Sequence, residues 1–428
     1  MIPAARIAAA IEVLTDLETR RRPAADALKD WGQTHRFAGS KDRAAIASLV
    51  YDALRRRASA AYVMGADTPR AVMLGMLRDL RGMSPAEIHS LFSGEGHAPA
   101  TLTAEEQASL ETGSLAGAPD HVAGDYPEWL ARAFADVFGE NAVEEGRALA
   151  ARAPVDLRVN TLKVGRDKAL VELEHLSARA TPLSPLGLRL PLTADGRGPA
   201  LSAEPAYAKG HVEVQDEGSQ IAALCGLAQP GEQILDFCAG GGGKTLALAA
   251  QTDNKGQIYA YDSDGRRLMP IYARLERAGA RNVQVRAPRG QADVLSDLKE
   301  RCDLVVVDAP CTGSGTWRRN PDAKWRMRPG ALEQRMKDQD EALQNAAKFV
   351  KSGGRLLYIT CSLLKAENEE RIQAFIAARP EFRPLDPAEL ARRAGLPLLV
   401  ERAHGVGLRL TPATTGTDGF FIAVLTRG

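Results

Sequence analysis

Two apolar segments of this chain each end in a cysteine, and one of them also ends in an aspartate. Residues 304–307 are apolar and mostly β-branched, and Asp308, Ala309, Pro310 and Cys311 follow them. This pattern is typical of a strand buried on both faces, which Pro310 prevents from continuing. Ligands of a parallel α/β sheet bind where its strands end, so a thiol and a carboxylate there are candidates for chemistry. A strand cap followed by a tight turn would explain the same residues.

The second segment favours chemistry over a simple turn. Residues 356–359 are apolar, and Thr360, Cys361 and Ser362 follow them. If the two strands are neighbours, both sulfurs lie at the same edge of the sheet. Two thiols in such positions are harder to attribute to chance than one.

The bulk composition limits the class of protein. The chain has 428 residues, and its 55 Lys+Arg nearly balance its 54 Asp+Glu. This length suits roughly two or three domains. Because the charges nearly balance, any nucleic-acid site must be a local basic patch. Basic residues cluster at Arg20 to Arg22, at Arg55 to Arg57 and at Arg318, Arg319, Lys324, Arg326 and Arg328. We interpret the first two clusters as solvated faces.

Cysteine usage and hydropathy predict a cytoplasmic protein. The five cysteines include no CxxC pair, so neither a disulfide framework nor a zinc site is expected. His35, His89, His97 and His121 also lack the spacing of metal ligands. Charges interrupt the N-terminal apolar residues, and no run approaches the roughly 18 apolar residues of a membrane span. We expect a monomer without metal or membrane contact.

Hydrophobic periodicity divides the chain into three regions. Residues 1–140 repeat apolar side chains at intervals of three and four, which predicts an all-helical domain. Residues 141–210 predict a small α+β linker module, in which Arg158 and Asn160 would lie on the surface of an edge strand. Residues 211–428 alternate strands and helices, which predicts a doubly wound α/β domain. Its strands are expected at 233–237, 257–261, 283–286, 304–307, 355–359 and, last, 420–425, and its helices at 243–250, 266–278, 331–350 and 365–378.

A glycine loop follows the first strand of the α/β domain. Asp236 lies in the strand predicted at 233–237, and Gly240 to Gly243 precede Lys244 at the start of a helix. Glycines there let the backbone approach a ligand and expose amide donors. A Walker A motif would need glycine where Cys238 stands, and the dinucleotide fingerprint lacks its third glycine. The remaining interpretation is S-adenosylmethionine, with Asp262 after the next strand accepting both ribose hydroxyls. The alternative for Asp262 is a helix cap.

Together, these segments resemble the RsmB-type (Sun-like) family of RNA cytosine carbon-5 methyltransferases. The resemblance is strong over residues 125–428 and rests on 214–220, 236–245, 308–311, 360–362 and 418–421. It implies a class I (Rossmann-like) methyltransferase fold with a last antiparallel strand. The helical region is similar, more weakly, to the NusB-like RNA-binding domain that precedes the catalytic part in the ribosomal-RNA members.

The chain departs from the family pattern at two places. The loop usually reads Ala-Pro-Gly-Gly-Lys, whereas glycine stands in place of proline between Ala239 and Lys244. Members of the family usually have an acidic residue after the third strand, on the adenine side of the cofactor. Arg289 occupies that position here, and Asp293 is the nearest acidic residue. We therefore assign no adenine contact.

The resemblance implies a role for each site residue. Carbon 5 of cytosine is a poor nucleophile until a thiolate adds to carbon 6, and the resemblance assigns that thiolate to Cys361. Asp308 would hold or protonate the cytosine edge, and Cys311 would help to release the product. The residues alone leave open which cysteine attacks. S-adenosylmethionine, whose product is S-adenosylhomocysteine, would contact Cys238, Ala239, Gly240, Gly241, Gly242, Gly243, Lys244, Asp262 and Asp308.

The segment after Cys311 suggests how RNA is bound. Trp317 and Trp325 stand among cations, which suits a flipped base and its flanking phosphates. Alternatively, one tryptophan packs in a core and the arginines face water. We expect methyl transfer to carbon 5 of a cytosine in RNA, with 16S ribosomal RNA favoured over transfer RNA. Another acceptor, such as a DNA base or a small molecule, and a non-catalytic RNA-binding or assembly factor are the alternatives.

Overall fold

The computed structural model describes residues 1–192, 198–290 and 292–428. The chain folds into two compact units. We call Met1–Arg152 together with Trp317–Pro329 the helical unit, and Ala153–Thr316 together with Gly330–Gly428 the sheet unit. A short stretch of the helical unit is thus inserted in the sequence of the sheet unit. The linker module expected at 141–210 belongs largely to the sheet unit in this division, and the three-domain arrangement stays a prediction.

In the helical unit, the amphipathic helices from α1 (Pro3–Arg20) to α7 (Ala104–Thr112) pack around a shared core. Ile46, Met73 and Leu74 are fully buried in it. Gly75 lies so close to Ala60 that an added Cβ would stand 2.7 Å from the Ala60 carbonyl oxygen, which explains the glycine at this helix crossing. The helices are α1 (Pro3–Arg20), α2 (Ala24–Thr34), α3 (Ser40–Arg55), α4 (Arg57–Met64), α5 (Pro69–Asp79), α6 (Pro85–Leu91), α7 (Ala104–Thr112), α8 (Asp120–Ala123), α9 (Ala131–Phe138), α10 (Ala142–Ala150) and α17 (Pro321–Arg326). Residues 1–140 are all described and contain no strand, as predicted, and the following residues up to 152 contain none either.

Two residues of the inserted stretch are deeply buried within the helical unit. Trp317 is 1% exposed, and its ring stacks on Phe134 with a centroid distance of 5.8 Å. Lys324 is also 1% exposed, and its Nζ donates hydrogen bonds to the carbonyl oxygens of Asp125 (2.6 Å) and Arg55 (3.1 Å). The prediction that Trp317 stacks on a flipped base is therefore wrong, because its indole is enclosed by protein. The alternative of a tryptophan packed in a core holds for this residue.

A small antiparallel sheet opens the sheet unit. Its strand order is β2 (Arg179–Ala180), β3 (Gly187–Leu190), β1 (Val155–Val159), β4 (Val212–Val214), and the short helices α11 (Arg166–Glu172) and α12 (Pro205–Ala208) accompany it. Arg158 and Asn160 are 3% and 4% exposed, so the prediction of surface positions is wrong. Asn160 donates through Nδ2 to the carbonyl oxygens of Gly210 and Ala278, both at 2.8 Å. A buried amide of this kind joins the small sheet to the rest of the unit.

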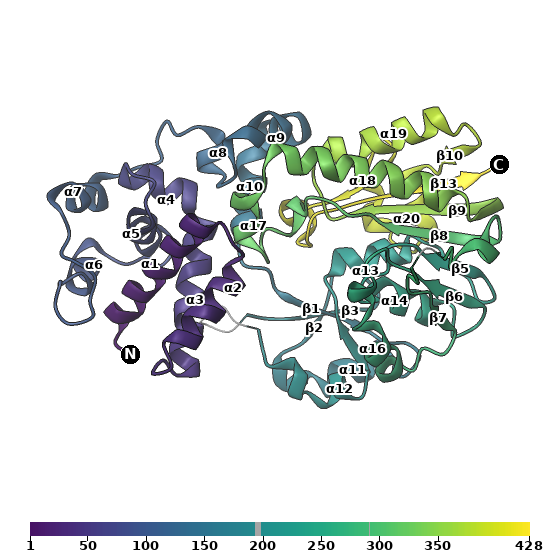
Figure 1. The fold of residues 1–428 in the computed structure, drawn as a ribbon, viewed down its shortest axis with the longest axis horizontal. Helices are drawn as coiled ribbons and strands as arrows, with labels where there is room; N and C mark the ends of the chain where they lie inside the picture. The colour runs from purple at the N-terminus through teal and green to yellow at the C-terminus, as the bar shows by residue number, and fades with distance from the viewer. Residues whose placement is uncertain (193–197, 291) are drawn as a thin grey trace. The chain divides into compact units, whose positions relative to one another are not determined.

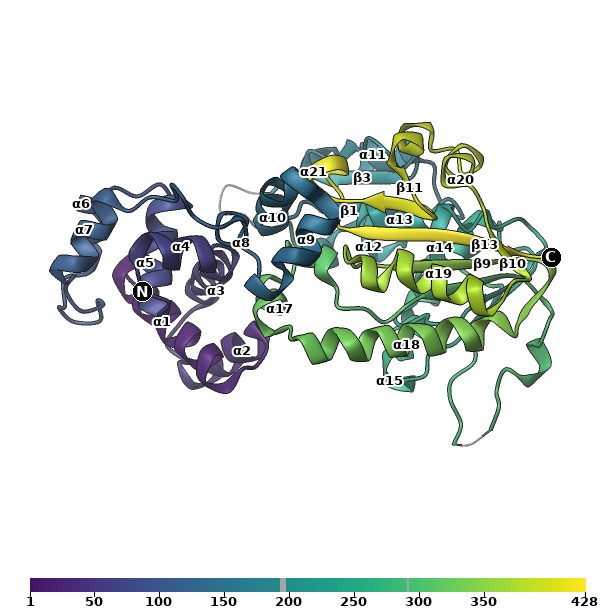
Figure 2. The same ribbon diagram turned by 90° about the horizontal axis from the view of Figure 1, so that it is seen from above.

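The large sheet has the predicted doubly wound class. Its order is β11 (Ala403–His404), β12 (Gly407–Leu410), β13 (Phe420–Arg427), β9 (Val350–Thr360), β8 (Cys302–Asp308), β5 (Gln233–Asp236), β6 (Gln257–Ala260), β7 (Val283–Val285), and β10 (Phe382–Pro384) pairs with β13. Strands β7, β6, β5, β8 and β9 are parallel, and β13 pairs antiparallel with β9. The long strands β9 and β13 lie side by side in Figure 2. The last antiparallel strand is thus confirmed.

Helices cover both faces of the large sheet (Figure 1). Leu304 and Val306 face the core shared with α13 (Glu217–Leu224) and α14 (Gly243–Gln251), whereas Val305 and Val307 face α18 (Pro329–Ala347) and α19 (Glu369–Ala378). Because successive side chains of a strand alternate between faces, only a continuously apolar run can fill both cores. The central strand is therefore buried on both faces, as predicted. The helix α20 (Pro387–Arg393) packs in the α13 core, and α21 (Pro412–Thr415) precedes β13.

Some element boundaries differ from the predictions. The helix expected at 266–278 is divided into α15 (Gly265–Leu268) and α16 (Ile271–Ala278), because Pro270 lacks an N–H group and interrupts the helix. The helix expected at 365–378 begins as a 3-10 turn, Lys365–Glu367. The short strands β10, β11 and β12 were not predicted. No helix among the described residues is both long and apolar enough to cross a membrane.

Candidate active site

The two strand-end thiols meet at one edge of the large sheet. Strands β8 and β9 are hydrogen-bonded neighbours, with Asp308 opposite Ile359. Cys311 Sγ lies 3.3 Å from Cys361 Sγ, and both side chains are partly exposed. The prediction that adjacent strands bring both sulfurs together is confirmed. The hydrogen bond with Cys361, together with burial, raises the pKa of the Cys311 thiol well above its usual value, so Cys311 keeps its proton at neutral pH.

Asp308, at the end of β8, pairs with the lysine of the glycine loop. Lys244 Nζ lies 2.6 Å from Asp308 Oδ2. The Lys244 side chain is 8% exposed, whereas the Asp308 side chain is 36% exposed. The Phe420 ring lies 5.6 Å from the same ammonium group. A buried ammonium thus orients a carboxylate that a ligand can still reach.

Glu367 positions the backbone around both thiols, and the sequence offered no signal for it. Its side chain is fully buried and accepts hydrogen bonds from Thr312 N (2.8 Å) and from Gln339 Nε2 (2.9 Å). The Ser362 hydroxyl also donates to it. Thr312 follows Cys311 and Ser362 follows Cys361, so one carboxylate holds the residues after both thiols. An acid inside a segment expected to be helical gives no hint of this role.

The glycine loop connects β5 to α14 as predicted. Gly242 has a φ of 82°, and an added Cβ would stand 2.4 Å from Ile271 Cγ1. A side chain at Gly242 is therefore excluded by both conformation and space. The first amides of α14, which begins at Gly243, have no partner within the helix and can bind an anionic group.

The side chain of Asp262 binds the glycine loop and does not cap a helix. It is 2% exposed and accepts hydrogen bonds from the backbone amides of Gly240 and Asp264, both at 3.0 Å. Arg267 Nη1 lies 3.4 Å from the same carboxylate. The cap of the following short helix is Asp264 instead. Asp262 thus holds the loop on the side of the next strand.

Two arginines also hold the glycine loop, and sequence reasoning missed both. Arg158 Nη1 donates to the Gly243 carbonyl oxygen (2.8 Å), and burial lowers the pKa of this guanidinium to about 10. Arg274 Nη1 donates to the Gly241 carbonyl oxygen (2.6 Å). Glu213, which is 2% exposed, pairs with Arg274. These contacts cross between segments far apart in sequence, so no local pattern could indicate them.

Burial raises the pKa of two groups beside the loop, a carboxyl and a thiol. Burial raises the pKa of Asp236 to about 7, even though Thr245 donates to its Oδ2 at 2.6 Å. Its other oxygen, Oδ1, has no hydrogen-bond partner among the described residues. Burial also raises the pKa of the Cys238 thiol, which excludes a thiolate there. The strand end beneath the loop therefore carries a carboxyl group that is readily protonated.

The remaining candidates contribute less. Asp293 is more than half exposed, lies 3.4 Å from Lys299 and accepts a hydrogen bond from Leu295 N (3.2 Å), and we assign it no ligand. Within residues 1–192, 198–290 and 292–428, His, Cys, Asp and Glu side chains form no cluster that could hold a metal ion.

The sheet order, its last antiparallel strand and the glycine loop define a class I methyltransferase fold. Residues 225–426 match the family described as 16S rRNA methyltransferase RsmB/F. Residues 126–195 match the ferredoxin-like domain of RsmF/B-like methyltransferases. The chain therefore contains the methyltransferase domain and the ferredoxin-like domain of the RsmB/F family.

Individual relatives agree with this assignment. A probable ribosomal RNA small subunit methyltransferase B of Synechocystis sp. is 34% identical over 303 residues, which are 70% of this chain and 66% of the relative. A ribosomal RNA small subunit methyltransferase B of Klebsiella pneumoniae is 33% identical over 302 residues, 70% of this chain and 65% of the relative. The match thus spans about two thirds of these relatives. The crystal structure of PH0851 covers 99% of both chains with a TM-score of 0.72 and 25% identity.

Proposed function

We propose that this protein transfers the methyl group of S-adenosylmethionine to carbon 5 of a cytosine in ribosomal RNA of the small subunit. The observation that carries the proposal is the 3.3 Å approach of Cys311 Sγ to Cys361 Sγ at the ends of neighbouring strands. Thiols at this edge suit addition to a pyrimidine ring and release from it. The names of the two relatives support ribosomal RNA as the acceptor.

Cys361 is the proposed nucleophile. Its thiolate adds to carbon 6 of the cytosine, and the displaced π electrons make carbon 5 nucleophilic. Asp308 holds or protonates the cytosine edge, and Lys244 orients this carboxylate. After methylation, a base such as water takes the proton from carbon 5, the electrons return to the ring, and the carbon–sulfur bond breaks so that Cys361 leaves as a thiolate. Cys311, next to the departing sulfur, is the side chain that we assign to assist this release.

S-adenosylmethionine, when bound, supplies a methyl group activated by its sulfonium. The residues that we propose to hold it are Cys238, Ala239, Gly240, Gly241, Gly242, Gly243, Lys244, Asp262 and Asp308. Two observations support the fit. The open amides at the start of α14 suit the carboxylate of the amino acid part. Asp262 accepts two backbone amides, and a carboxylate has lone pairs left for two ribose hydroxyls.

Transfer of labelled methyl groups tests the function directly. The purified full chain is incubated with methyl-labelled S-adenosylmethionine and with separate pools of ribosomal and transfer RNA. Digestion to nucleosides then identifies the labelled product. We expect label in 5-methylcytidine from the ribosomal pool. Label in another nucleoside would contradict the cytosine chemistry, and label only in transfer RNA would contradict the acceptor. No label in either pool, with S-adenosylmethionine still bound, would favour a non-catalytic factor.

A further inference from the structure

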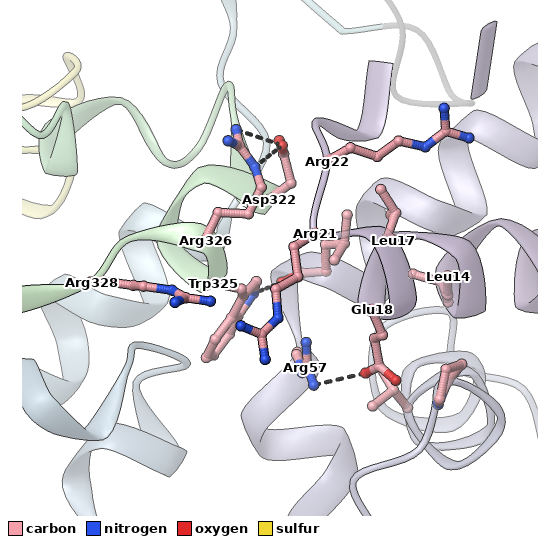
Figure 3. A pocket seen from close by; sticks show the side chains of 13 residues that line it. Leu14, Leu17, Glu18, Arg21, Arg22, Arg57, Asp322, Trp325, Arg326 and Arg328 are labelled. Atoms are coloured by element: carbon pink, nitrogen blue, oxygen red, sulfur yellow. Dashed lines mark hydrogen bonds and ion pairs between the residues drawn. The ribbon is translucent and has the colours of Figure 1, made fainter. Parts of the chain in front are cut away.

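The helical unit contains a pocket that joins the three basic clusters seen in the sequence. Its volume is about 530 Å³, within the range of roughly 300–1,000 Å³ typical of small-molecule sites. Figure 3 shows its lining side chains, which come from α1, α3, α4, α5 and α17 and from the residues that follow α1 and α17. They are Leu14, Leu17, Glu18, Arg21, Arg22, Leu54, Arg57, Pro69, Val72, Asp322, Trp325, Arg326 and Arg328. Arginines from all three clusters thus line one pocket, although Arg20 and Arg21 of the first cluster are exposed to solvent, as interpreted.

The pocket has an excess of positive charge. Arg57 pairs with Glu18 at 2.7 Å and Arg326 with Asp322 at 3.0 Å, so these charges are balanced locally. Arg21 and Arg328 are exposed, and neither side chain has a hydrogen-bond or ion-pair partner among the described residues. Figure 3 shows the side chains of Arg21 and Arg328 extending toward Trp325. Two unpaired guanidinium groups in one pocket favour the binding of an anionic ligand, and guanidinium binds phosphate well.

The pocket also has a flat aromatic surface. Trp325 is half-buried, and its Nε1 donates to the Leu54 carbonyl oxygen at 2.6 Å, which holds the indole in place. Leu14 and Leu17 add apolar lining. The Arg57 guanidinium carbon lies 5.9 Å from the centre of the indole ring. An aromatic ring among cations is the arrangement on which nucleic-acid bases stack while their phosphates pair with arginine.

A second cavity adjoins the first along the same side chains. It has a volume of about 760 Å³, and Arg57 and Trp325 line both cavities. Tyr62, which is 42% exposed, lines the second cavity and offers another aromatic ring. Two neighbouring hollows with aromatic and cationic lining suit successive nucleotides of one strand. The bases must be unstacked to reach these rings, which favours single-stranded RNA over a duplex.

We propose that this pocket binds an unstacked nucleotide of single-stranded RNA, with its base against Trp325 and its phosphates on Arg21 and Arg328. This inference rests on the proposed function, because it takes the RNA substrate as the source of the strand. It assigns a nucleotide site that carries out no chemistry and lies wholly within the helical unit. The site would hold a single-stranded part of the substrate other than the target cytosine.

Fluorescence anisotropy with a cytosine-free probe tests the pocket. The probe is a fluorescein-labelled 12-nucleotide oligoadenylate, which offers no cytosine for the thiols, and the protein is the full chain. We expect Trp325→Ala to weaken binding roughly 5- to 100-fold, the scale of one lost base–aromatic stack. Arg21→Glu and Arg328→Glu should each weaken it several-fold and reduce the salt dependence of log K by at least about 1.

Matched variants separate the pocket from general charge. Arg20 is next to Arg21 and its side chain is 67% exposed, but it lies outside the pocket and pairs with Asp16. Trp129 is a partly exposed tryptophan of the same unit that does not line the pocket. We expect Arg20→Glu and Trp129→Ala to bind within twofold of each other and of the wild-type protein. Equal losses for Arg20→Glu and Arg21→Glu, or an unchanged affinity in Trp325→Ala, would overturn the proposal.

The outcomes also separate this inference from the proposed function. If the wild-type protein labels no RNA but Trp325→Ala still loses oligoadenylate affinity, the function is wrong and the pocket stands. If the wild-type protein labels cytosine and no pocket variant changes affinity, only the pocket is wrong. If Trp325→Ala does not fold, Arg21→Glu still decides, because Arg21 is exposed and lies beyond the end of α1. Free inorganic phosphate that competes as well as the oligonucleotide would overturn the role of the base.

Discussion

The sheet unit and the helical unit assemble their candidate sites in different ways. In the sheet unit, Asp308, Cys311 and Cys361 stand just after β8 and β9, which are paired neighbours. In the helical unit, Arg21 and Arg328 are far apart in the sequence, and only helix packing brings them to one pocket. A parallel sheet gathers the residues after its strands at one edge. A helical bundle has no such rule, so its sites are harder to see in a sequence.

The two units also contrast in their buried ionisable groups. Burial raises the pKa of Asp236 in the sheet unit to about 7. Burial lowers the pKa of Lys324 in the helical unit, also to about 7. Both shifts favour the uncharged form, but one group is an acid and the other a base. The two units should therefore respond to pH in opposite directions.

The largest expected effect comes from the thiol pair. Cys361→Ala should lower methyl transfer by at least about 10³-fold, because removing a nucleophile removes the covalent route. Cys311→Ala should leave addition intact but slow release, so that protein stays covalently attached to RNA. Incorporation of labelled methyl groups measures the first outcome, and denaturing gel electrophoresis with labelled ribosomal RNA measures the second.

Cys225 and Cys302 provide matched controls for this comparison. Both are fully buried in the cores of the sheet unit, away from the strand ends that carry the site. The folded fraction of Cys225→Ala and of Cys302→Ala should retain methyl transfer. Equal losses in all four variants would show that the strand-end position of a thiol has no special meaning.

The carboxylate at the end of β8 should have the next largest effect. Asp308→Asn removes the carboxyl group that holds or protonates the cytosine edge and leaves Lys244 without its anionic partner, so we expect transfer to fall roughly 10²-fold. Asp303→Asn is the matched control, because Asp303 lies near the start of the same strand and pairs with Lys351. Initial rates at saturating S-adenosylmethionine make the comparison. Similar losses at both ends of β8 would contradict a site at the carboxyl end.

Lys324 should make the stability of the helical unit depend on pH. The pKa of Lys324 is about 7 in the folded chain and 10.5 as its ordinary value, so the unfolded state binds more protons between these values. The free energy of unfolding therefore rises with pH between about 7 and 10.5. Above about pH 10.5 Lys324 is uncharged in both states and burying it costs no deprotonation, whereas below about pH 7 this cost is at its maximum. Lys324→Met should remove this dependence, a change of a few kcal/mol. Urea unfolding at several pH values measures it.

Lys41→Met, at an exposed lysine of α3, is the control for that experiment. It should keep the pH dependence of the wild-type protein. If Lys324→Met and the wild-type protein show the same slope between pH 7 and pH 10, then Lys324 is charged in the folded state and the contrast between the units fails.

Asp236 should give a smaller effect of the opposite sign. The pKa of Asp236 is about 7 in the folded chain against an ordinary value of 3.8, so the folded state binds more protons between these values. The stabilisation that comes from the protonated Asp236 side chain in the folded state is full below about pH 4 and is lost as the pH rises to about 7. Asp236→Asn should flatten this part of the profile in urea unfolding. Asp297→Asn, whose side chain is 53% exposed, should leave it unchanged, and a matching change there would refute the assignment.

Much of the sheet unit could be predicted because its signals are local. The run 304–307 indicated a strand buried on both faces, and Pro310 marked its end. The glycines before α14 indicated a loop that approaches a ligand. The helix boundary at Pro270 was missed, although proline is a helix breaker, because apolar side chains on both sides continue the helical period.

The contacts that orient the site could not be predicted. Glu367, Arg158 and Arg274 hold the loops around the thiols and the glycines, and each acts on residues distant in sequence. Hydrophobic periodicity tells which side of an element is buried, but it does not tell which polar group meets which. Such pairings depend on how the loops between elements fold.

The sequence by itself determined the order of the main strands and helices of the sheet unit, its doubly wound class and the strand ends at which Asp308, Cys311 and Cys361 stand. It could do so because strand periodicity, proline and glycine act through the local backbone. Only the tertiary structure decided that Trp317 is buried in the helical unit while Trp325 lines a pocket. The two tryptophans have similar neighbours in the sequence. Their different burial arises from helix packing, which joins residues that are far apart along the chain.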